Sequence, residues 1–225
     1  MLYQYKFWHS LTHPSYFVEM LENSEMKGYR KRWLLVFLLT VFLFVIRDYW
    51  GMGTQSLTEL FATNENDTFG IARLLSLVGA ALLAVIYFAF YYYGVSYILH
   101  VFTDIPTKLI QKVQLYVVVF LVLEKAIELV VFFGVGYTTT FSFMSLAPMT
   151  TYFINETTTL YILNQVTVAT VLTIVTQYVF LSKWVEPEEQ KGLLLKVIGL
   201  QLFFAVFIGM LSVLPVKEWI IRGLL

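Results

Sequence analysis

Long apolar segments separated by short polar ones dominate the chain from residue 33 onward. A helix that crosses a bilayer needs roughly 20 mostly apolar residues, and several of these segments reach that length. They lie at about residues 33–50, 71–100, 113–137, 157–184 and 193–214. The pattern predicts an all-α, polytopic integral membrane protein, built as a bundle of five transmembrane helices over residues 29–225.

The segment ahead of the first span, residues 1–28, has an amphipathic pattern. Thr12 suits a helix N-cap, and Pro14 suits a first helical turn. Apolar residues then recur on one side of the predicted helix, opposite acidic ones. We expect a short cytoplasmic helix that lies in the inner membrane interface or docks on a partner.

Composition strengthens the membrane assignment. The chain has 225 residues, of which 59% are hydrophobic and 13% charged, and its mean hydropathy is +0.73. Soluble domains are far less apolar. The formal net charge is zero, so no basic field indicates a nucleic-acid partner. The chain has no cysteine, which excludes disulfides and thiolate metal sites.

The basic residues between the spans predict the orientation. Cytoplasmic loops of membrane proteins carry an excess of Lys and Arg. Here these residues gather in the segments that five spans would place inside, whereas the loops 51–70 and 138–156 contain none. The inner set is Lys27, Arg30, Lys31, Arg32, Lys108, Lys112, Lys183 and Lys191. The N-terminus is therefore expected inside and the C-terminus outside.

The third span carries Glu124, Lys125 and Glu128 near its midpoint. Insertion scales give each central charge a cost of about 2.5–3.5 kcal/mol, so this helix should be enclosed by the others. Lys125 lies three residues before Glu128 and can pair with it, which leaves one carboxylate without a partner. The set is a proton or cation relay, or it is a structural ion pair. We favour the structural interpretation, because no second helix with a carboxylate is evident.

Polar and small residues on the other spans supply candidate neighbours for this cluster. A small-residue stripe on the second span permits close helix packing, and a row of threonines on the fourth span faces other helices. The packing stripe consists of Ser76, Ala80 and Ala84. The candidate partners of the leftover carboxylate are Asn164, Thr167, Thr170, Gln177 and Gln201.

The sequence offers no sign of catalysis. No metalloprotease, serine-hydrolase or paired-aspartate signature is present. His9 and His13 have a spacing that could share a metal, but no acidic third ligand lies nearby. We therefore expect no catalytic, cofactor-binding or metal-binding residues.

In its overall pattern the chain resembles the bacterial form of the Yip family, the Ypt/Rab-interacting type of small membrane protein. The likeness rests on the segment Leu11–Phe17 with its proline, on the five spans and their orientation, and on the stretch from Gly94 to Phe102 that leads through Thr107 and Lys108 into the third span. The Asp-Leu-Tyr-Gly-Pro motif of eukaryotic members is absent. The resemblance implies a non-enzymatic helper linked to ABC-type export or toxin-resistance systems.

Two functional hypotheses follow. The first is an accessory or scaffold protein of the bacterial cytoplasmic membrane. Its partners are the lipid bilayer and other membrane proteins, with an ABC exporter as the favoured partner. The sequence is also compatible with a homo-oligomer. The second is a small transporter or a proton or ion pathway that uses Glu124, Lys125 and Glu128. The first is favoured, because the sequence shows no inverted repeat and no pair of broken helices of the kind secondary transporters use.

Overall fold

The computed structural model describes residues 28–52 and 66–213, and every secondary-structure element named in that part of the chain is a helix. The all-α prediction is confirmed there. The amphipathic helix predicted within residues 1–28 lies outside the described residues, apart from Gly28. The elements are α3 (Tyr29–Tyr49), α5 (Asn66–Ala89), the π-helix η1 (Phe90–Gly94), α6 (Val95–Thr103), α7 (Thr107–Val135), α8 (Ala147–Thr150), α9 (Thr157–Leu163), α10 (Val168–Leu181) and α11 (Gln190–Val213).

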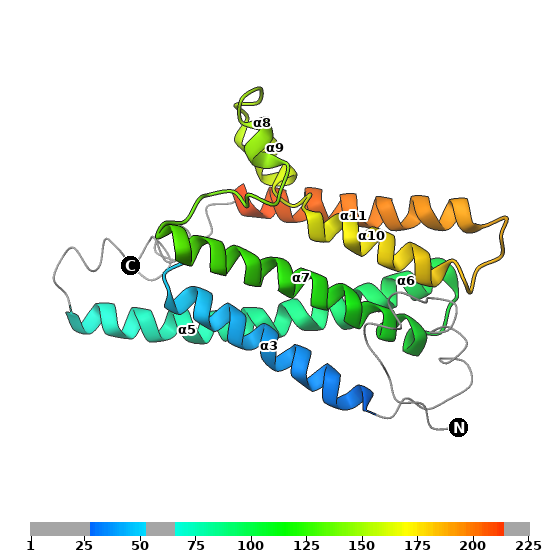
Figure 1. Ribbon diagram of the computed structural model, residues 1–225, viewed down its shortest axis with the longest axis horizontal. Helices are drawn as coiled ribbons and strands as arrows, with labels where there is room; N and C mark the ends of the chain where they lie inside the picture. Colours follow the sequence, from blue (N-terminus) through cyan, green and yellow to red (C-terminus); the bar gives the residue numbers. More distant parts are fainter. Residues whose placement is uncertain (1–27, 53–65, 214–225) are drawn as a thin grey trace.

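The long helices run along a common direction, and α7 lies at their centre (Figure 1). It packs against α3, η1, α6 and α10, while α11 packs on α10 and α9. We call the end of the bundle where α3, α7 and α11 begin the proximal end, and the end toward which they run the distal end. The long helix of α5, η1 and α6 runs the opposite way, from the distal to the proximal end.

Two helical stretches in the described part of the chain are long and apolar enough to cross a membrane, judged by length and composition. They are Gly70–Thr103 and Gln190–Val213, which correspond to the predicted second and fifth spans. Both are consistent with a membrane protein. The stretch Gly70–Thr103 is not a uniform α-helix, because the π-helix η1 interrupts it.

The prediction of one continuous helix over residues 157–184 is wrong. The chain forms α9, turns at residues 164–167 and then forms the separate helix α10. Thr167 is extended, with φ −112° and ψ 174°, and its hydroxyl accepts a hydrogen bond from the Thr170 N–H, while the Thr170 hydroxyl accepts one from the Thr167 N–H. This reciprocal pair is a capping box, which starts a helix. Thr167 and Thr170, which the sequence pattern placed in a row of packing threonines, therefore mark the start of a helix.

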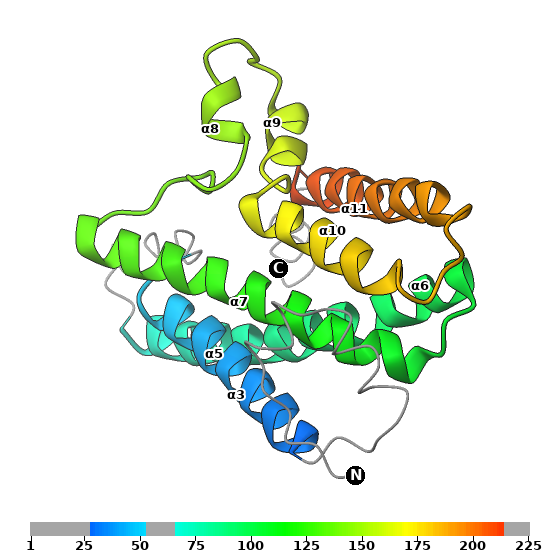
Figure 2. The same cartoon turned by 45° about the vertical axis from the view of Figure 1, so that its right-hand side comes forward.

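The helix α9 crosses α11 at a large angle and leaves the bundle, whereas α10 runs beside α11 (Figure 2). The crossing depends on Gly209: a Cβ there would lie 2.6 Å from Cγ1 and 2.7 Å from Cα of Ile162. Only glycine lets the two backbones approach so closely. Together α8, α9 and their connection form a projection, here called the arm (residues 147–163). Tyr152 and Phe153 in its connection are 86% and 88% exposed.

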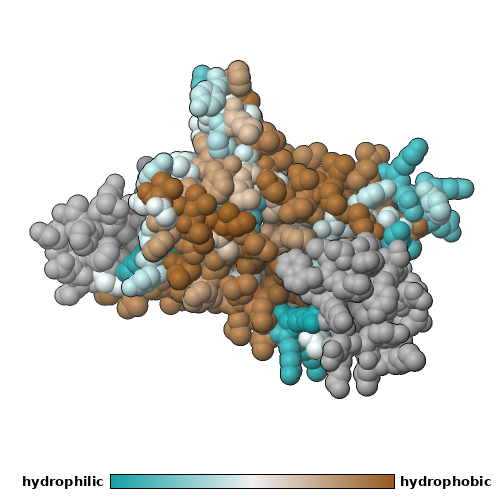
Figure 3. All heavy atoms as spheres, in the orientation of Figure 1, coloured by the Kyte–Doolittle hydropathy of each residue, from teal (hydrophilic) through white to brown (hydrophobic). Residues whose placement is uncertain are grey.

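The bundle has an apolar core that also buries several polar side chains, and apolar side chains cover its outside. Thr40, Gln114 and Gln177 are fully buried, whereas Ile71 and Leu195 are 70% and 72% exposed. In Figure 3 hydrophobic residues cover the middle of the visible face, and hydrophilic ones gather near the start of α3 and at the connection between α10 and α11. Soluble monomers rarely expose contiguous apolar patches of more than a few hundred Å², so this exposed apolar surface is consistent with a membrane protein.

The predicted packing stripe lies on α5, which packs mainly on α3. Ala84 is fully buried and Ala80 is half-buried. Ser76 donates a hydrogen bond of 2.8 Å to the Asp48 carboxylate near the end of α3. The stripe thus contributes a buried methyl group and one polar contact at the distal end of this helix pair.

Candidate functional site

The first turn of α10 packs against α7 with one side buried: Ala169 is 2% exposed, whereas Val168 is 49% exposed. A helix start leaves its first N–H groups without helical partners and carries a partial positive charge. The Glu124 side chain, which is only 4% exposed, accepts a hydrogen bond of 2.8 Å from the Ala169 N–H. Glu124, the carboxylate that was expected to be left without a partner, therefore caps a helix.

The second carboxylate, Glu128, has two cationic partners. Lys125 Nζ lies 3.2–3.3 Å from its two oxygens, and Arg47 of α3 donates to Oε2 at 3.3 Å. Lys125 also lies 3.8 Å from the Glu124 carboxylate. Arg47, Glu124, Lys125 and Glu128, here called the charge cluster, thus join three helices, because α3 and α10 both bind to side chains of α7.

Arg47 was not among the predicted site residues, and neither was the neighbouring pair of Asp48 and Arg73. Arg73 lies 3.9 Å from the Asp48 carboxylate and donates to the backbone oxygens of Asp48, at 2.7 Å, and Tyr49. The sequence did contain a signal for these three residues. They are charged residues at the span ends that are expected to face outside, where the positive-inside rule does not predict arginine. In the structure each finds an opposite charge within the bundle.

A pocket of about 360 Å³ opens beside the charge cluster at the distal end. We call it the vestibule. The side chains of Arg47 and Lys125 are 23% and 27% exposed, whereas those of Glu124 and Glu128 are 4% and 3% exposed. The two cations therefore present more of their surface to this space than Glu128, which also lines it, and Glu124 is not part of its lining. The lining residues are Arg47, Met52, Lys125, Glu128, Phe132, Thr138, Thr139, Thr140, Ser142, Tyr161 and Asn164.

The five predicted partners have other positions. Thr167 and Thr170 flank Ala169 and build the start of α10. Asn164 lines the vestibule, and its Oδ1 accepts hydrogen bonds from the Ser142 N–H and the Ser145 hydroxyl at 2.8 and 2.9 Å. None of these three side chains bonds directly to Glu124 or Glu128 in the described part of the chain.

Gln177 and Gln201 belong to a separate buried row. Gln177 donates to Gln114 of α7 at 3.0 Å, and Gln201 of α11 donates to Gln177 at 3.3 Å. This row links three helices through amide groups, away from the charge cluster. Among the described residues, the Gln114 Nε2 atom and the Thr173 hydroxyl are buried without a hydrogen-bond partner.

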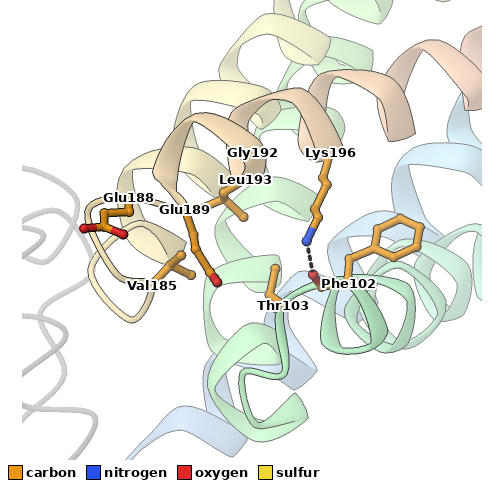
Figure 4. A pocket seen from close by; sticks show the side chains of 8 residues that line it. All are labelled: Phe102, Thr103, Val185, Glu188, Glu189, Gly192, Leu193 and Lys196. Carbon is orange, nitrogen blue, oxygen red and sulfur yellow. Dashed lines mark hydrogen bonds between the residues drawn. The ribbon is translucent and has the colours of Figure 1, made fainter.

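A second pocket, of about 280 Å³, lies at the proximal end between α6 and the start of α11. Figure 4 shows Glu189 and Lys196 directed toward its opening, and Glu188 directed away from it. Lys196 donates a hydrogen bond of 2.7 Å to the Phe102 carbonyl near the end of α6. The cation of this pocket is therefore already bound to backbone, unlike the cations of the vestibule.

No group of three or more potential metal ligands occurs within residues 28–52 and 66–213. Comparison with known proteins finds no matching family model, no matching curated protein and no matching solved structure. The interpretation of the site therefore depends on its geometry.

Proposed function

We propose that this chain is a five-span protein of the bacterial cytoplasmic membrane that binds a small polar solute in the vestibule and passes it, or a proton, along the charge cluster. The observation that carries this proposal is the start of α10 inside the bundle, capped by Glu124 at 2.8 Å. The broken helix removes part of the argument that favoured an accessory protein from the sequence alone.

Physical constraints on backbone in lipid support this function. Non-helical backbone at membrane depth is tolerated only where protein buries it or where it lines a water-filled cavity. Residue Asn164 of the break lines the vestibule. Half-helices that begin inside a membrane are a recurrent element of solute and ion sites in transporters. With 14 residues, α10 is about 21 Å long, which is shorter than the bilayer core of about 30 Å.

The proposed topology follows from the basic segments. Lys108, Lys191 and the basic start of α3 are at the proximal end, which we assign to the cytoplasm. The vestibule then opens to the outside. α3, the stretch Gly70–Thr103, α7, α10 and α11 form the five passes. The charges of α3 and α7 near the distal end pair with one another, which lowers the cost of placing both helices in lipid.

Buried polar groups extend from the cluster toward the proximal end. On α10, Thr173 follows Ala169 by one helical turn, and Gln177 follows Thr173 by another. The hydroxyl of Thr173 and the amide nitrogen of Gln114 have no hydrogen-bond partner among the described residues. Groups of this kind can hold water, so we propose that they continue the path beyond Glu124.

Flux measurements in reconstituted vesicles test the proposal. We expect the wild-type protein to dissipate an imposed gradient of H⁺, Na⁺, K⁺ or Cl⁻ faster than empty vesicles do. Glu128→Gln should reduce that flux by roughly tenfold or more, since it removes the charge that organises Arg47 and Lys125. The matched control is Glu188→Gln, which changes an exposed carboxylate at the proximal end. A wild-type protein that passes none of these ions and no radiolabelled small organic anion such as acetate would reject a transport role.

The arm favours a second candidate, the accessory role that the Yip-like pattern implies. It projects from the bundle, and Tyr152 and Phe153 are its most exposed aromatic residues (Figure 1). Exposed aromatic side chains are typical anchors of protein interfaces. Affinity purification in mild detergent should then recover another membrane protein, an ABC-type exporter in the first instance, and the double change Tyr152→Ser with Phe153→Ser should lose it. Recovery of the chain alone would count against this role.

A further inference from the structure

We propose that the ligand of the vestibule is a small monovalent organic anion, namely a short-chain carboxylate. This inference rests on the proposed solute-binding function and adds the chemical class. It is carried by the difference between the charges that a solute can reach and the charges that it cannot. Arg47 and Lys125 are partly exposed to the vestibule, while Glu124 and Glu128 are almost completely buried.

The two carboxylates have their oxygens engaged. Both Glu128 oxygens lie within 3.3 Å of Lys125 Nζ, and Oε2 also accepts from Arg47. Glu124 binds the Ala169 N–H through Oε2 and lies 3.8 Å from Lys125 through Oε1. A cation that entered the vestibule would therefore compete with Arg47 and Lys125 for the oxygens of Glu128, which are already engaged.

Arg47 keeps donors for an additional ligand. A guanidinium carries five N–H donors, and Arg47 uses one of its terminal nitrogens for Glu128. Its other donors have no protein partner among the described residues. A planar guanidinium binds a carboxylate through two parallel hydrogen bonds, which makes arginine well suited to this ligand.

The balance of charge around the vestibule favours a ligand with one negative charge. The formal charges of Arg47, Lys125, Glu124 and Glu128 sum to zero, and the start of α10 beside Glu124 adds about half a positive charge. A monovalent anion on Arg47 and Lys125 therefore leaves a small net charge, whereas a divalent anion leaves a larger negative one.

The remaining walls fit a short apolar chain on that anion. Phe132, Met52 and Tyr161 present apolar surface, and Thr138 and Thr140 present hydroxyl groups on the connection after α7. A volume of about 360 Å³, at the small end of the range for ligand pockets, has room for a short-chain carboxylate.

Equilibrium binding of radiolabelled acetate to the full chain in lipid nanodiscs tests the inference. We expect saturable binding that propionate displaces and that sulfate and tetramethylammonium do not displace. Arg47→Gln should weaken acetate binding about tenfold or more, since it removes the donors that hold the carboxylate. Lys196→Gln is the matched control, because it removes a cation from the proximal pocket and should leave acetate binding unchanged.

The wild-type competition keeps the test decisive if Arg47→Gln fails to fold. Absence of saturable acetate binding to the folded wild-type protein would overturn the inference, as would displacement of bound acetate by sulfate as effective as by propionate. Saturable binding of radiolabelled rubidium in place of acetate would show a cation site. If acetate binding fails in one of these ways but an ion flux depends on Glu128, only the ligand inference is wrong and the proposed function is supported. Acetate binding without any flux would reject the transport role but support the ligand class.

Discussion

The carboxylate of Glu124 on α7 accepts a 2.8 Å hydrogen bond from the backbone N–H of Ala169, the second residue of α10. The residues are 45 positions apart in the chain. The contact explains how the bundle accommodates both a charge near the centre of an apolar helix and the unpaired N–H groups of a buried helix start. Each would be costly alone, and each satisfies the other's electrostatic need.

Removal of the acceptor should therefore destabilise the bundle more than removal of the charge. We expect Glu124→Ala to lower the free energy of unfolding by about 1–3 kcal/mol, since it leaves the buried Ala169 N–H without a partner. Glu124→Gln keeps an acceptor oxygen and should have a smaller effect. Denaturation of the purified variants in detergent provides the comparison. Equal losses for both variants would contradict the capping role.

Arg47 and Glu128 should show energetic coupling. Each single change, Arg47→Gln or Glu128→Gln, leaves a charge without its partner at 3.3 Å, whereas the double change leaves neither. A double-mutant cycle on unfolding stability should give a coupling of about 0.5–3 kcal/mol, with the double variant more stable than the sum of the single effects predicts. Strict additivity would mean that the pair contributes nothing to the association of α3 with α7.

Gly209 and Gly199 on α11 form a matched pair of sites. A Cβ at Gly209 would lie 2.6 Å from an Ile162 side-chain atom and 2.7 Å from its Cα, whereas a Cβ at Gly199 would have no such neighbour within 4 Å. We expect Gly209→Ala to destabilise the protein by about 1–3 kcal/mol because α9 must move away. Gly199→Ala should be neutral or slightly stabilising, since alanine is the better helix former. The same loss at both sites would argue against the close crossing.

The start of α9 should depend on pH. Hydrogen bonds from the side chain and then the backbone N–H of Thr159 hold the pKa of the Glu156 carboxyl below its ordinary value of 4.5. A carboxyl with a lowered pKa in the folded state stabilises that state above its ordinary pKa, and this contribution is lost as the pH falls through the lowered value. A spin label attached at Tyr152→Cys should report greater mobility of the arm as the pH falls through that lowered pKa. Glu156→Gln should remove most of that pH dependence, and a transition that persists unchanged in Glu156→Gln would assign it to another group.

The sequence predicted the helical class and an apolar helix at residues 113–137 whose charges need enclosure. Periodic and apolar patterns involve residues close together in the chain, so they can be recognised without knowledge of the fold. The break at residues 164–167 was missed because threonines every three residues fit both a packed helix face and the capping box of Thr167 with Thr170. The deciding contact, from Glu124 to Ala169, connects distant parts of the chain.

Arg47 was missed for a different reason. At the end of an apolar segment, an arginine resembles an ordinary boundary residue, and its partner Glu128 is 81 positions away. The π-helix η1 also has no marker in the apolar pattern of its helix. The small-residue stripe, in contrast, needed no distant partner to be noticed, because Ser76, Ala80 and Ala84 recur at a fixed spacing.

The accessibility of Asn164 from outside the cell tests the central claim, that the vestibule connects the external solution to the break before α10. The chain has no cysteine, so Asn164→Cys introduces a single thiol, and Val130→Cys on the 69% exposed face of α7 supplies a lipid-facing control. A charged, membrane-impermeant thiol reagent added to intact cells should modify the thiol of Asn164→Cys and leave that of Val130→Cys unmodified. Modification of the Asn164→Cys thiol only after the membrane is permeabilised, or no modification at all in the folded protein, would contradict the account.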